Sequence, residues 1–290
     1  MFEGFERVRQ EIDGVLVNAV CGGAGPPVLL VHGFPQTHAM WHRIAPDLAR
    51  DHTVVAPDLR GYGDSGRPPS GDDHAGYSFR AMAADPVGLM RALGHERFAV
   101  VGHDRGARVA HRMALDHADA VTRVALLDIL PTLHVYDHVD RALATAYYHW
   151  FFFIQPADLP ERLIAADPTA YLHSLLGGWG SRLDAFAPEA VAEYERCFAD
   201  PDARHAMLED YRAGASIDLE HDRADLHRRV AAPLLALWGS RSVVARGHPL
   251  EVWRGRGDDV RGAPVDAGHF LAEERPAETL AAVRTFLDPS

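Results

Sequence analysis

Short apolar runs alternate with longer amphipathic stretches along the first half of this chain. The runs are rich in valine, leucine and alanine, and each ends in turn-forming residues. Runs of this kind are typical of strands buried in a parallel sheet, and the amphipathic stretches between them predict crossover helices. We therefore expect an α/β fold with a mostly parallel twisted sheet flanked by helices. The predicted strands are residues 28–31, 53–56, 98–101, 121–129 and 233–238, and the predicted helices include residues 39–50 and residues 79–93, the latter interrupted at Pro86.

The stretch between the last two predicted strands has a different character. Residues 131–215 are rich in helix formers and contain an aromatic run at 147–153, but no convincing strand. We interpret this stretch as a helical cap inserted over the carboxyl edge of the sheet, with additional core helices as the alternative. The predicted core then comprises residues 1–130 and 216–290, and its last element is an amphipathic helix over 276–287.

All 29 basic residues of the chain are arginine, because the sequence contains no lysine. This composition excludes Schiff-base chemistry, a lysine general base and a P-loop lysine. With 41 acidic residues the formal net charge is -12, and the basic residues form no run. We therefore expect neither nucleic acid nor a membrane as a partner. An anionic substrate would need a local arginine site.

The two cysteines, Cys21 and Cys197, lie far apart and form no CxxC pattern. A disulfide framework is not expected, and a reducing compartment fits this cysteine usage. The first residues lack the basic and apolar regions of a signal peptide. No stretch of ~18 uncharged apolar residues predicts a transmembrane helix. We expect a cytoplasmic protein.

The most informative segment is Gly-His-Asp-Arg-Gly at residues 102–106, which follows a predicted strand and precedes a predicted helix. This arrangement is that of a nucleophile elbow with Asp104 where serine usually stands. The flanking glycines leave room for a strained turn, and the helix start favours an ionised carboxylate. Asp104 is the candidate nucleophile, because a carboxylate attacks carbon without a base and leaves an ester. An ordinary tight turn is the alternative.

Hydrolysis of such an ester needs a general base and a group that orients it. His269 is the candidate base, because Gly268-His269 follows a short predicted strand downstream of the nucleophile. Its alternative is a surface or capping role. Asp128 is the candidate acid, because it ends a strand at the carboxyl edge of the sheet. Helix capping is the alternative for Asp128, but the competing position after Trp238 offers no carboxylate.

His-Gly-Phe-Pro at residues 32–35 follows the first apolar strand and is the expected oxyanion loop. The backbone N–H groups of Phe34 and Arg105 are expected to face the oxyanion that forms when the ester is attacked. Pre-placed donors of this kind contribute about 3–4 kcal/mol each. The glycine-rich turn at residues 57–66 is interpreted as structural support. No metal site is expected, because the histidines show no H-E-x-x-H or similar spacing.

Four motifs, which follow one another along the predicted core, resemble those of the α/β hydrolases: residues 32–35, 60–65, 102–106 and 268–269. The aspartate in the elbow resembles the epoxide hydrolase and dehalogenase branch of that superfamily. Within the branch, Asp-Arg-Gly-Ala-Arg at residues 104–108 resembles the fluoroacetate dehalogenases, also called haloacetate dehalogenases. Haloalkane dehalogenases and epoxide hydrolases usually carry tryptophan directly after the nucleophile.

The resemblance implies that Arg105 and Arg108 bind the carboxylate of a substrate. The spacing agrees with this role, because residues three positions apart on a helix face the same side. Planar guanidinium groups hold a carboxylate by forked, charge-assisted hydrogen bonds, and nearby cations keep Asp104 ionised. For Arg108 the alternative is an ion pair with a surface acid.

The resemblance also implies a halide site made of His149, Trp150 and Tyr211. Each of these side chains carries an N–H or O–H donor, and fluoride is a strongly hydrated ion whose water the donors would replace. The alignment is least secure at Tyr211. Its alternatives are Tyr147, Tyr148 and Trp179.

The resemblance therefore implies an enzyme that hydrolyses small 2-haloacids, converting fluoroacetate and water into glycolate and fluoride through an ester on Asp104. No cofactor is required, the partner is a small-molecule haloacid, and a homodimer is common among such relatives. One alternative is a dehalogenase that prefers chloroacetate. Another is an epoxide hydrolase with the same nucleophile. A third is a receptor of this fold that binds its ligand without turnover.

Overall fold

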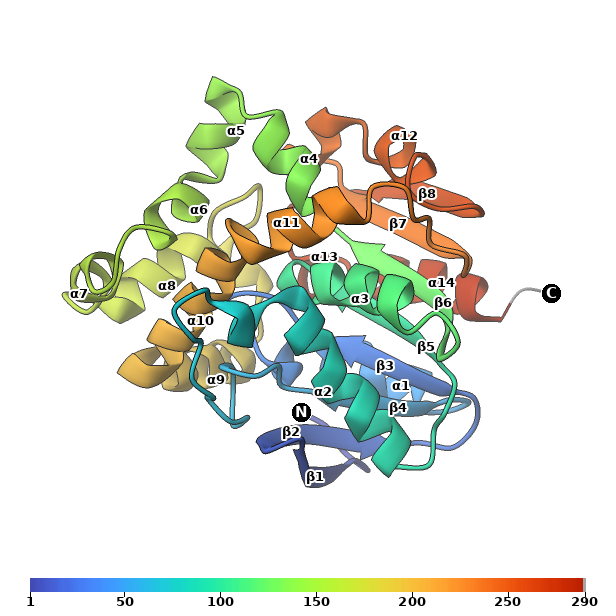
Figure 1. The fold of residues 1–290 in the computed structure, drawn as a ribbon. Coiled ribbons are helices and arrows are strands. Elements are labelled where there is room, and N and C mark those ends of the chain that lie inside the picture. Colours follow the sequence, from blue (N-terminus) through green and yellow to red (C-terminus); the bar gives the residue numbers. More distant parts are fainter. Residues whose placement is uncertain (289–290) are drawn as a thin grey trace.

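The sheet of this protein has eight strands in the order β1-β2-β4-β3-β5-β6-β7-β8 (Figure 1). The computed structural model describes residues 1–288. β1 pairs antiparallel with β2, and β2 with β4, whereas the neighbours from β4 through β8 are parallel. The α/β fold with a mostly parallel sheet is therefore confirmed. The strands are β1 Glu6–Ile12, β2 Val15–Gly22, β3 Pro27–Val31, β4 Thr53–Pro57, β5 Phe98–His103, β6 Val121–Leu127, β7 Leu234–Gly239 and β8 Val260–Val265.

The central strands are apolar because helices cover both faces of the sheet. Every residue of β5 is buried. In Figure 1, α2 (Phe79–Ala92) and α3 (Arg105–Asp116) lie in front of the sheet, and α14 (Pro276–Leu287) lies behind it. α14 is the closing helix predicted over 276–287. The described chain also contains the short helices α12 Pro249–Arg254 and α13 Leu271–Glu274 and the 3₁₀ turns η2 Ala75–Tyr77 and η4 Val243–Gly247.

Three local predictions differ from the structure. The helix predicted over 39–50 is wrong, because a 3₁₀ turn, η1 (His38–Trp41), and a short helix, α1 (Ala45–Leu48), occupy this stretch. Pro46 lacks the N–H that a continuous helix would need there, and its ring would clash with the preceding turn. α2, by contrast, continues through Pro86. β6 ends two residues earlier than predicted, since Asp128 has a φ of 53° that leaves the extended conformation.

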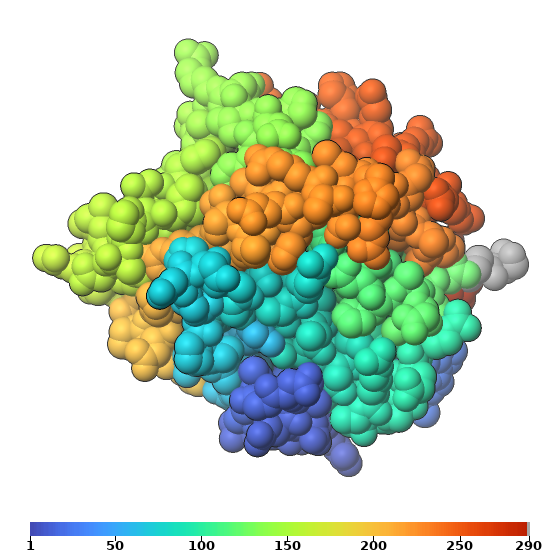
Figure 2. All heavy atoms as spheres, in the orientation of Figure 1, coloured from blue at the N-terminus to red at the C-terminus, as the bar shows by residue number. Residues whose placement is uncertain are grey.

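The chain between β6 and β7 is helical, and its described residues contain no named strand. Its middle part, around α7, projects from one side of the molecule as the yellow-green lobe in Figure 2. The division into a core and a cap at residues 131–215 stays a prediction. The helices are α4 Thr132–Asp137, α5 Arg141–Ala146, α6 Tyr148–Phe153, α7 Leu159–Ile164, α8 Pro168–Leu176, the 3₁₀ turn η3 Leu183–Ala185, α9 Pro188–Ala199, α10 Pro201–Gly214 and α11 Ile217–Ala224.

None of the helices formed by residues 1–288 has both the length and the apolar surface that crossing a lipid bilayer requires.

Candidate active site

Asp104 lies in the sharp turn between β5 and α3, as the motif at residues 102–106 predicts. Its φ of 48° is unusual for a residue with a side chain, and the turn is therefore strained. A Cβ on Gly106 would lie 2.1 Å from the His32 carbonyl oxygen, and a Cβ on Gly102 would lie 2.5 Å from the Gly106 carbonyl oxygen. The two glycines are therefore required for the close packing that holds this turn.

The Asp104 carboxylate is buried, but the groups around it favour its charged form. The Phe34 backbone N–H donates to Asp104 Oδ1 at 3.0 Å. Burial alone would raise the pKa of Asp104, but the hydrogen bond and charge of His269, together with the charge of Arg108, hold this pKa well below its usual range. Asp104 is therefore ionised at neutral pH.

His269 lies between Asp104 and Asp128. Its Nδ1 is 2.6 Å from Asp128 Oδ2, and its Nε2 is 3.6 Å from Asp104 Oδ2. Asp128 is itself fixed, because the Gly239 N–H and the Ser242 hydroxyl donate to its two oxygens. Burial lowers the pKa of His269, but the hydrogen bonds and charges of the two aspartates outweigh it and raise this pKa to about 9.

One of the two predicted oxyanion donors already contacts the nucleophile. The Phe34 N–H reaches Asp104 Oδ1, so it is in place for an oxygen that becomes more negative. The Arg105 backbone N–H, on the other hand, donates no hydrogen bond to the Asp104 side chain in the described structure. Its role in the oxyanion hole stays a prediction.

Arg105 is completely buried and paired with an acid that the sequence analysis missed. Its Nε donates to Asp210 Oδ2 at 2.9 Å, and its Nη2 donates to both Asp210 Oδ1 and the Asp210 carbonyl oxygen. The guanidinium contacts the rings of Phe79 and Tyr211, with its Cζ 4.7 Å and 4.4 Å from their centroids. No sequence motif marks Asp210; its only signal is its position next to Tyr211.

Arg108 is held differently from Arg105. Its Nη1 donates to the Leu130 carbonyl oxygen at 2.8 Å and to Thr132 Oγ1 at 2.9 Å, and its Cζ lies 4.6 Å from the centroid of the Trp150 ring. Its Nε is buried without a hydrogen-bond partner among the described residues. Within residues 1–288 Arg108 forms no ion pair with a surface acid, and its role as a ligand of a substrate carboxylate stays a prediction.

His149, Trp150 and Tyr211 form an aromatic cluster next to Phe34. The ring of Tyr211 lies 5.7 Å from that of His149 and 6.2 Å from that of Trp150. Within residues 1–288, His149 Nδ1 is buried without a hydrogen-bond partner, and neither Trp150 Nε1 nor the Tyr211 hydroxyl makes a hydrogen bond. The structure therefore brings together three donors that protein groups leave open.

The alternatives to Tyr211 differ in their hydrogen bonds. Trp179 Nε1 donates to the Ala146 carbonyl oxygen at 3.1 Å, and the Tyr148 hydroxyl lies 3.4 Å from that of Tyr171. Tyr147, which is buried, stacks on the Trp150 ring at 5.2 Å. Among the three alternatives, Tyr147 is therefore the one whose hydroxyl stays open to a ligand in the described structure.

A cavity of about 150 Å³ adjoins the site between α4, α5 and η4. Tyr147 and Leu130 line it from the side of the site, and the exposed Arg246 lines it from the side of η4. The candidate site therefore borders a space large enough for a small molecule of a few heavy atoms.

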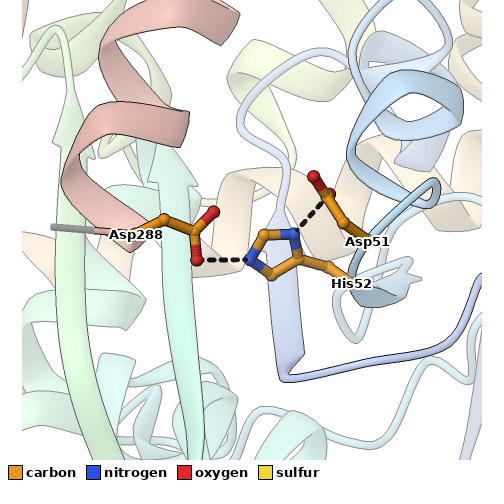
Figure 3. Close-up of side chains that lie close together, drawn as sticks. All are labelled: Asp51, His52 and Asp288. Carbon is orange, nitrogen blue, oxygen red and sulfur yellow. Dashed lines mark hydrogen bonds and ion pairs between the residues drawn. The ribbon is translucent and has the colours of Figure 1, made fainter. Parts of the chain in front are cut away.

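A separate cluster of Asp51, His52 and Asp288 lies where the end of α14 meets the start of β4 (Figure 3). His52 Nδ1 is 2.8 Å from Asp51 Oδ1, and Nε2 is 3.6 Å from Asp288 Oδ1. One imidazole nitrogen therefore faces each carboxylate, and Arg284 also pairs with Asp51. One of the two carboxylates of this cluster therefore already has an arginine as its partner.

Comparison with known proteins agrees with the geometry of the elbow and the sheet. Residues 26–276 match the family model described as the alpha/beta hydrolase fold. The chain belongs to the α/β-hydrolase family. This α/β hydrolase is 49% identical over 289 residues to a fluoroacetate dehalogenase from Burkholderia sp., a match that covers 99% of this chain and 95% of that protein.

Two further proteins are similar to this α/β hydrolase. A soluble epoxide hydrolase from Corynebacterium sp. (strain C12) is 33% identical over 282 residues, a match that covers 96% of this chain and 96% of that protein. A solved structure of a protein assigned to the α/β hydrolases from Nostoc sp. PCC 7120 superposes with a TM-score of 0.98 at 53% identity over 100% of both chains. The resemblance inferred from the motifs, to the α/β hydrolases and to the fluoroacetate dehalogenases, is confirmed.

Proposed function

We propose that this α/β hydrolase is a dehalogenase that converts small 2-haloacids, with fluoroacetate as the reference substrate, into 2-hydroxyacids and halide. The observation that carries the proposal is the combination of an ionised Asp104, two nearby arginines and three aromatic donors that have no hydrogen-bond partner among the described residues. In this set the arginines match the carboxylate of the substrate, Asp104 matches the carbon that it attacks, and the aromatic donors match the departing halide. The identity to a fluoroacetate dehalogenase supports the same activity.

In the first step an oxygen of Asp104 attacks the carbon that bears fluorine. A C–O bond forms, the C–F bond breaks, and fluoride leaves with the bonding electron pair. Arg105 and Arg108 hold the substrate carboxylate, while His149, Trp150 and Tyr211 donate hydrogen bonds to fluoride. The product of this step is an ester of the Asp104 carboxyl group, formed without proton transfer.

In the second step His269 removes a proton from water, which attacks the carbonyl carbon of the ester. The Phe34 N–H supports the oxyanion, and Asp128 stabilises the charged imidazole. Collapse breaks the bond between the Asp104 carboxyl carbon and the oxygen that attacked the substrate. Glycolate leaves with that oxygen and takes a proton from the His269 imidazolium. The oxygen from water stays on Asp104, which loses its remaining proton to solvent and becomes a carboxylate again. Esterification also removes the negative charge that helped to raise the pKa of His269, so the imidazole becomes a competent base only after the ester exists.

The two steps are expected to differ in their dependence on pH. Ester formation needs ionised Asp104, whose pKa is lowered, so its rate should be constant between about pH 5 and about pH 8. Ester hydrolysis needs neutral His269, so its rate should rise with pH and level off below the resting pKa of about 9. Rapid-quench measurement of both steps on one protein sample tests this. A hydrolysis rate that falls as pH rises would contradict the role of His269.

Replacing Tyr211 with phenylalanine is expected to slow fluoride release by about 10- to 100-fold, because a hydrogen bond to a charged leaving group is lost. The effect should be smaller with chloroacetate, since chloride is larger and more weakly hydrated. Tyr147→Phe is the matched control, because this hydroxyl is also buried near the Trp150 ring. A larger loss in Tyr147→Phe than in Tyr211→Phe would assign the halide contact to Tyr147 instead.

Epoxide hydrolysis is the second candidate, supported by the Corynebacterium relative and by the hydroxyls of Tyr147 and Tyr211. Both tyrosines are buried, and burial and the charge of Asp104 raise the pKa of each. A neutral epoxide makes no ion pair with Arg108, whose Nε has no hydrogen-bond partner in the part of the chain that the structure describes. Fluoride release from fluoroacetate, chloride release from chloroacetate and diol formation from styrene oxide, measured side by side, separate the candidates. Diol formation with no halide release would overturn the proposal, and ligand binding without any turnover would favour a receptor.

The partner that we propose is the haloacid itself, with neither nucleic acid nor a membrane involved. A cytoplasmic location and a homodimer stay predictions. Light scattering of the purified chain at several concentrations measures its molar mass and so tests whether it forms a homodimer.

A further inference from the structure

Most hydrogen-bond donors of Arg105 are already occupied. Nε donates to Asp210 Oδ2, and the two N–H groups of Nη2 reach Asp210 Oδ1 and the Asp210 carbonyl oxygen. Within residues 1–288 only Nη1 makes no hydrogen bond. Arg105 can therefore offer a substrate one nitrogen, not the two-nitrogen fork that the sequence analysis expected of both arginines.

The Arg105 side chain is also fixed in place. Its Cζ lies 4.7 Å from the Phe79 centroid and 4.4 Å from the Tyr211 centroid, and a Cβ on Gly214 would lie 3.0 Å from Nη2. The Tyr62 hydroxyl donates to Asp210 Oδ2 at 2.8 Å, so the oxygen that Arg105 Nε contacts is also held by a second donor. Neither partner of this pair can turn toward a ligand without breaking several contacts.

The pair is also balanced in charge. The side chains of Arg105 and Asp210 are 1% and 0% exposed, so water does not screen either charge. A cation next to an anion in such surroundings exerts little net attraction on a third ion, because the two fields oppose each other. Arg105 can therefore orient a bound carboxylate, but it adds little net positive charge to the site.

Arg108 shows the opposite pattern. Its Nη1 is occupied by two neutral oxygens, on Leu130 and Thr132, and no aspartate or glutamate within residues 1–288 forms a salt bridge with it. Nε and Nη2 donate to no described residue, and together they form the planar edge that matches a carboxylate. Arg108 thus has an open fork, and within residues 1–288 its charge has no salt-bridge partner, although the Asp104 carboxylate lies near enough for the two charges to interact.

We infer that Asp210 is a positioning residue that holds Arg105 and cancels its charge, so that Arg108 alone recognises the substrate carboxylate by a fork. This inference rests on the proposed function, and it assigns unequal roles to the two arginines. Arg105 orients the bound acid through Nη1. By cancelling this charge, Asp210 also lowers the affinity of the site for carboxylates in general, including the product and unreactive acids. Tight binding of these anions then does not slow turnover.

Acetate is the probe that tests this inference, because it carries the carboxylate but no leaving group. Its binding is measured by calorimetry and does not depend on turnover. In Asp210→Asn we expect acetate to bind about tenfold more tightly, because Arg105 becomes an uncompensated cation. We expect kcat for fluoroacetate to fall in the same variant, because Nη1 is no longer held. A merely structural role would weaken both acetate binding and catalysis.

Asp85→Asn is the matched control. Asp85 pairs with Arg60 through the same Nε and Nη2 edge, at 2.6 Å and 2.5 Å, in a pair that is also largely buried but outside the site. This variant should lose stability without changing acetate affinity. Acetate affinity that rises equally in Asp85→Asn and Asp210→Asn would overturn the inference.

A double variant keeps the test decisive if Asp210→Asn alone folds poorly. Arg105→Gln alone leaves the Asp210 carboxylate buried without its partner, and acetate binding should be lost. Arg105→Gln combined with Asp210→Asn removes both charges and should restore acetate binding to within a few-fold of the unaltered protein, because Arg108 remains. A double variant that still fails to bind acetate would show that Arg105 is itself the required cation, which overturns the inference.

The outcome also separates this inference from the proposed function. If the unaltered protein releases no halide from any haloacid, the proposed function fails, whatever acetate does. If it releases halide, but acetate affinity is unchanged or reduced in Asp210→Asn, the proposed function stands and the inference fails.

Discussion

Replacement of Asp104 with asparagine is expected to reduce halide release from fluoroacetate by roughly 10⁴-fold or more, the scale on which removing a covalent nucleophile acts. The amide is close to the carboxylate in shape, so the Phe34 N–H keeps an acceptor and the turn keeps its packing. The amide lacks the negatively charged oxygen with which Asp104 attacks carbon. Initial rates of fluoride release, followed with an ion-selective electrode, give the result.

Two controls accompany this measurement. Asp104→Ala removes the possibility that water activated by His269 slowly converts the amide back to the carboxylate. Asp119→Asn changes an exposed aspartate beyond the other end of α3 and should leave the rate unchanged. Activity within tenfold of the unaltered protein in both Asp104 variants would exclude this residue as the nucleophile.

Replacement of His269 with asparagine is expected to stop the reaction halfway. Ester formation does not require the imidazole as a base, so fluoride should appear in a burst of one equivalent per active site. The following turnover should be slower by roughly 10²- to 10⁴-fold, the range that general-base catalysis supplies. The burst is measured by rapid quench, and the ester is detected as the mass of a glycolate unit on the peptide that contains Asp104.

His227→Asn, a change at an exposed histidine, is the control and should show normal turnover. If His269→Asn releases fluoride steadily without a burst and without a modified peptide, the hydrolysis step does not depend on this histidine. If it shows neither a burst nor turnover, His269 is needed before the ester forms.

Much of the fold follows from the sequence because strands and turns are encoded locally. The apolar runs at residues 28–31, 53–56 and 98–101 lie within strands. They are recognisable because strands buried on both faces of a parallel sheet consist mainly of β-branched and aliphatic residues. β1 and β2 precede the first strand that was predicted. Of the seven residues of β1, only Ile12 is buried, so its apolar signal is weak.

The catalytic candidates were predictable for a different reason. Asp104, Asp128 and His269 each follow a strand, and the carboxyl ends of parallel strands meet at one edge of the sheet. Chain order and turn chemistry therefore place them near one another without knowledge of side-chain positions. The structure brings His269 to 2.6 Å from Asp128 and 3.6 Å from Asp104.

The arginine contacts could not be predicted in this way. Asp210 lies 105 residues after Arg105 on a helix with no motif, and only the packing of α10 near the elbow brings them together. Which edge of each guanidinium is occupied depends on Asp210, Leu130 and Thr132, none of which the local pattern singles out. The sequence thus predicts two cations but not their unequal roles.

The central claim, covalent catalysis by Asp104, is tested most directly by one turnover of fluoroacetate in water enriched in heavy oxygen, with enzyme in excess over substrate. The account predicts that the label enters the peptide containing Asp104, and that the first glycolate released is unlabelled, because water attacks the carbonyl carbon of the ester. Label in that first glycolate, with none in the peptide, would mean that water displaces fluoride directly and would contradict the account.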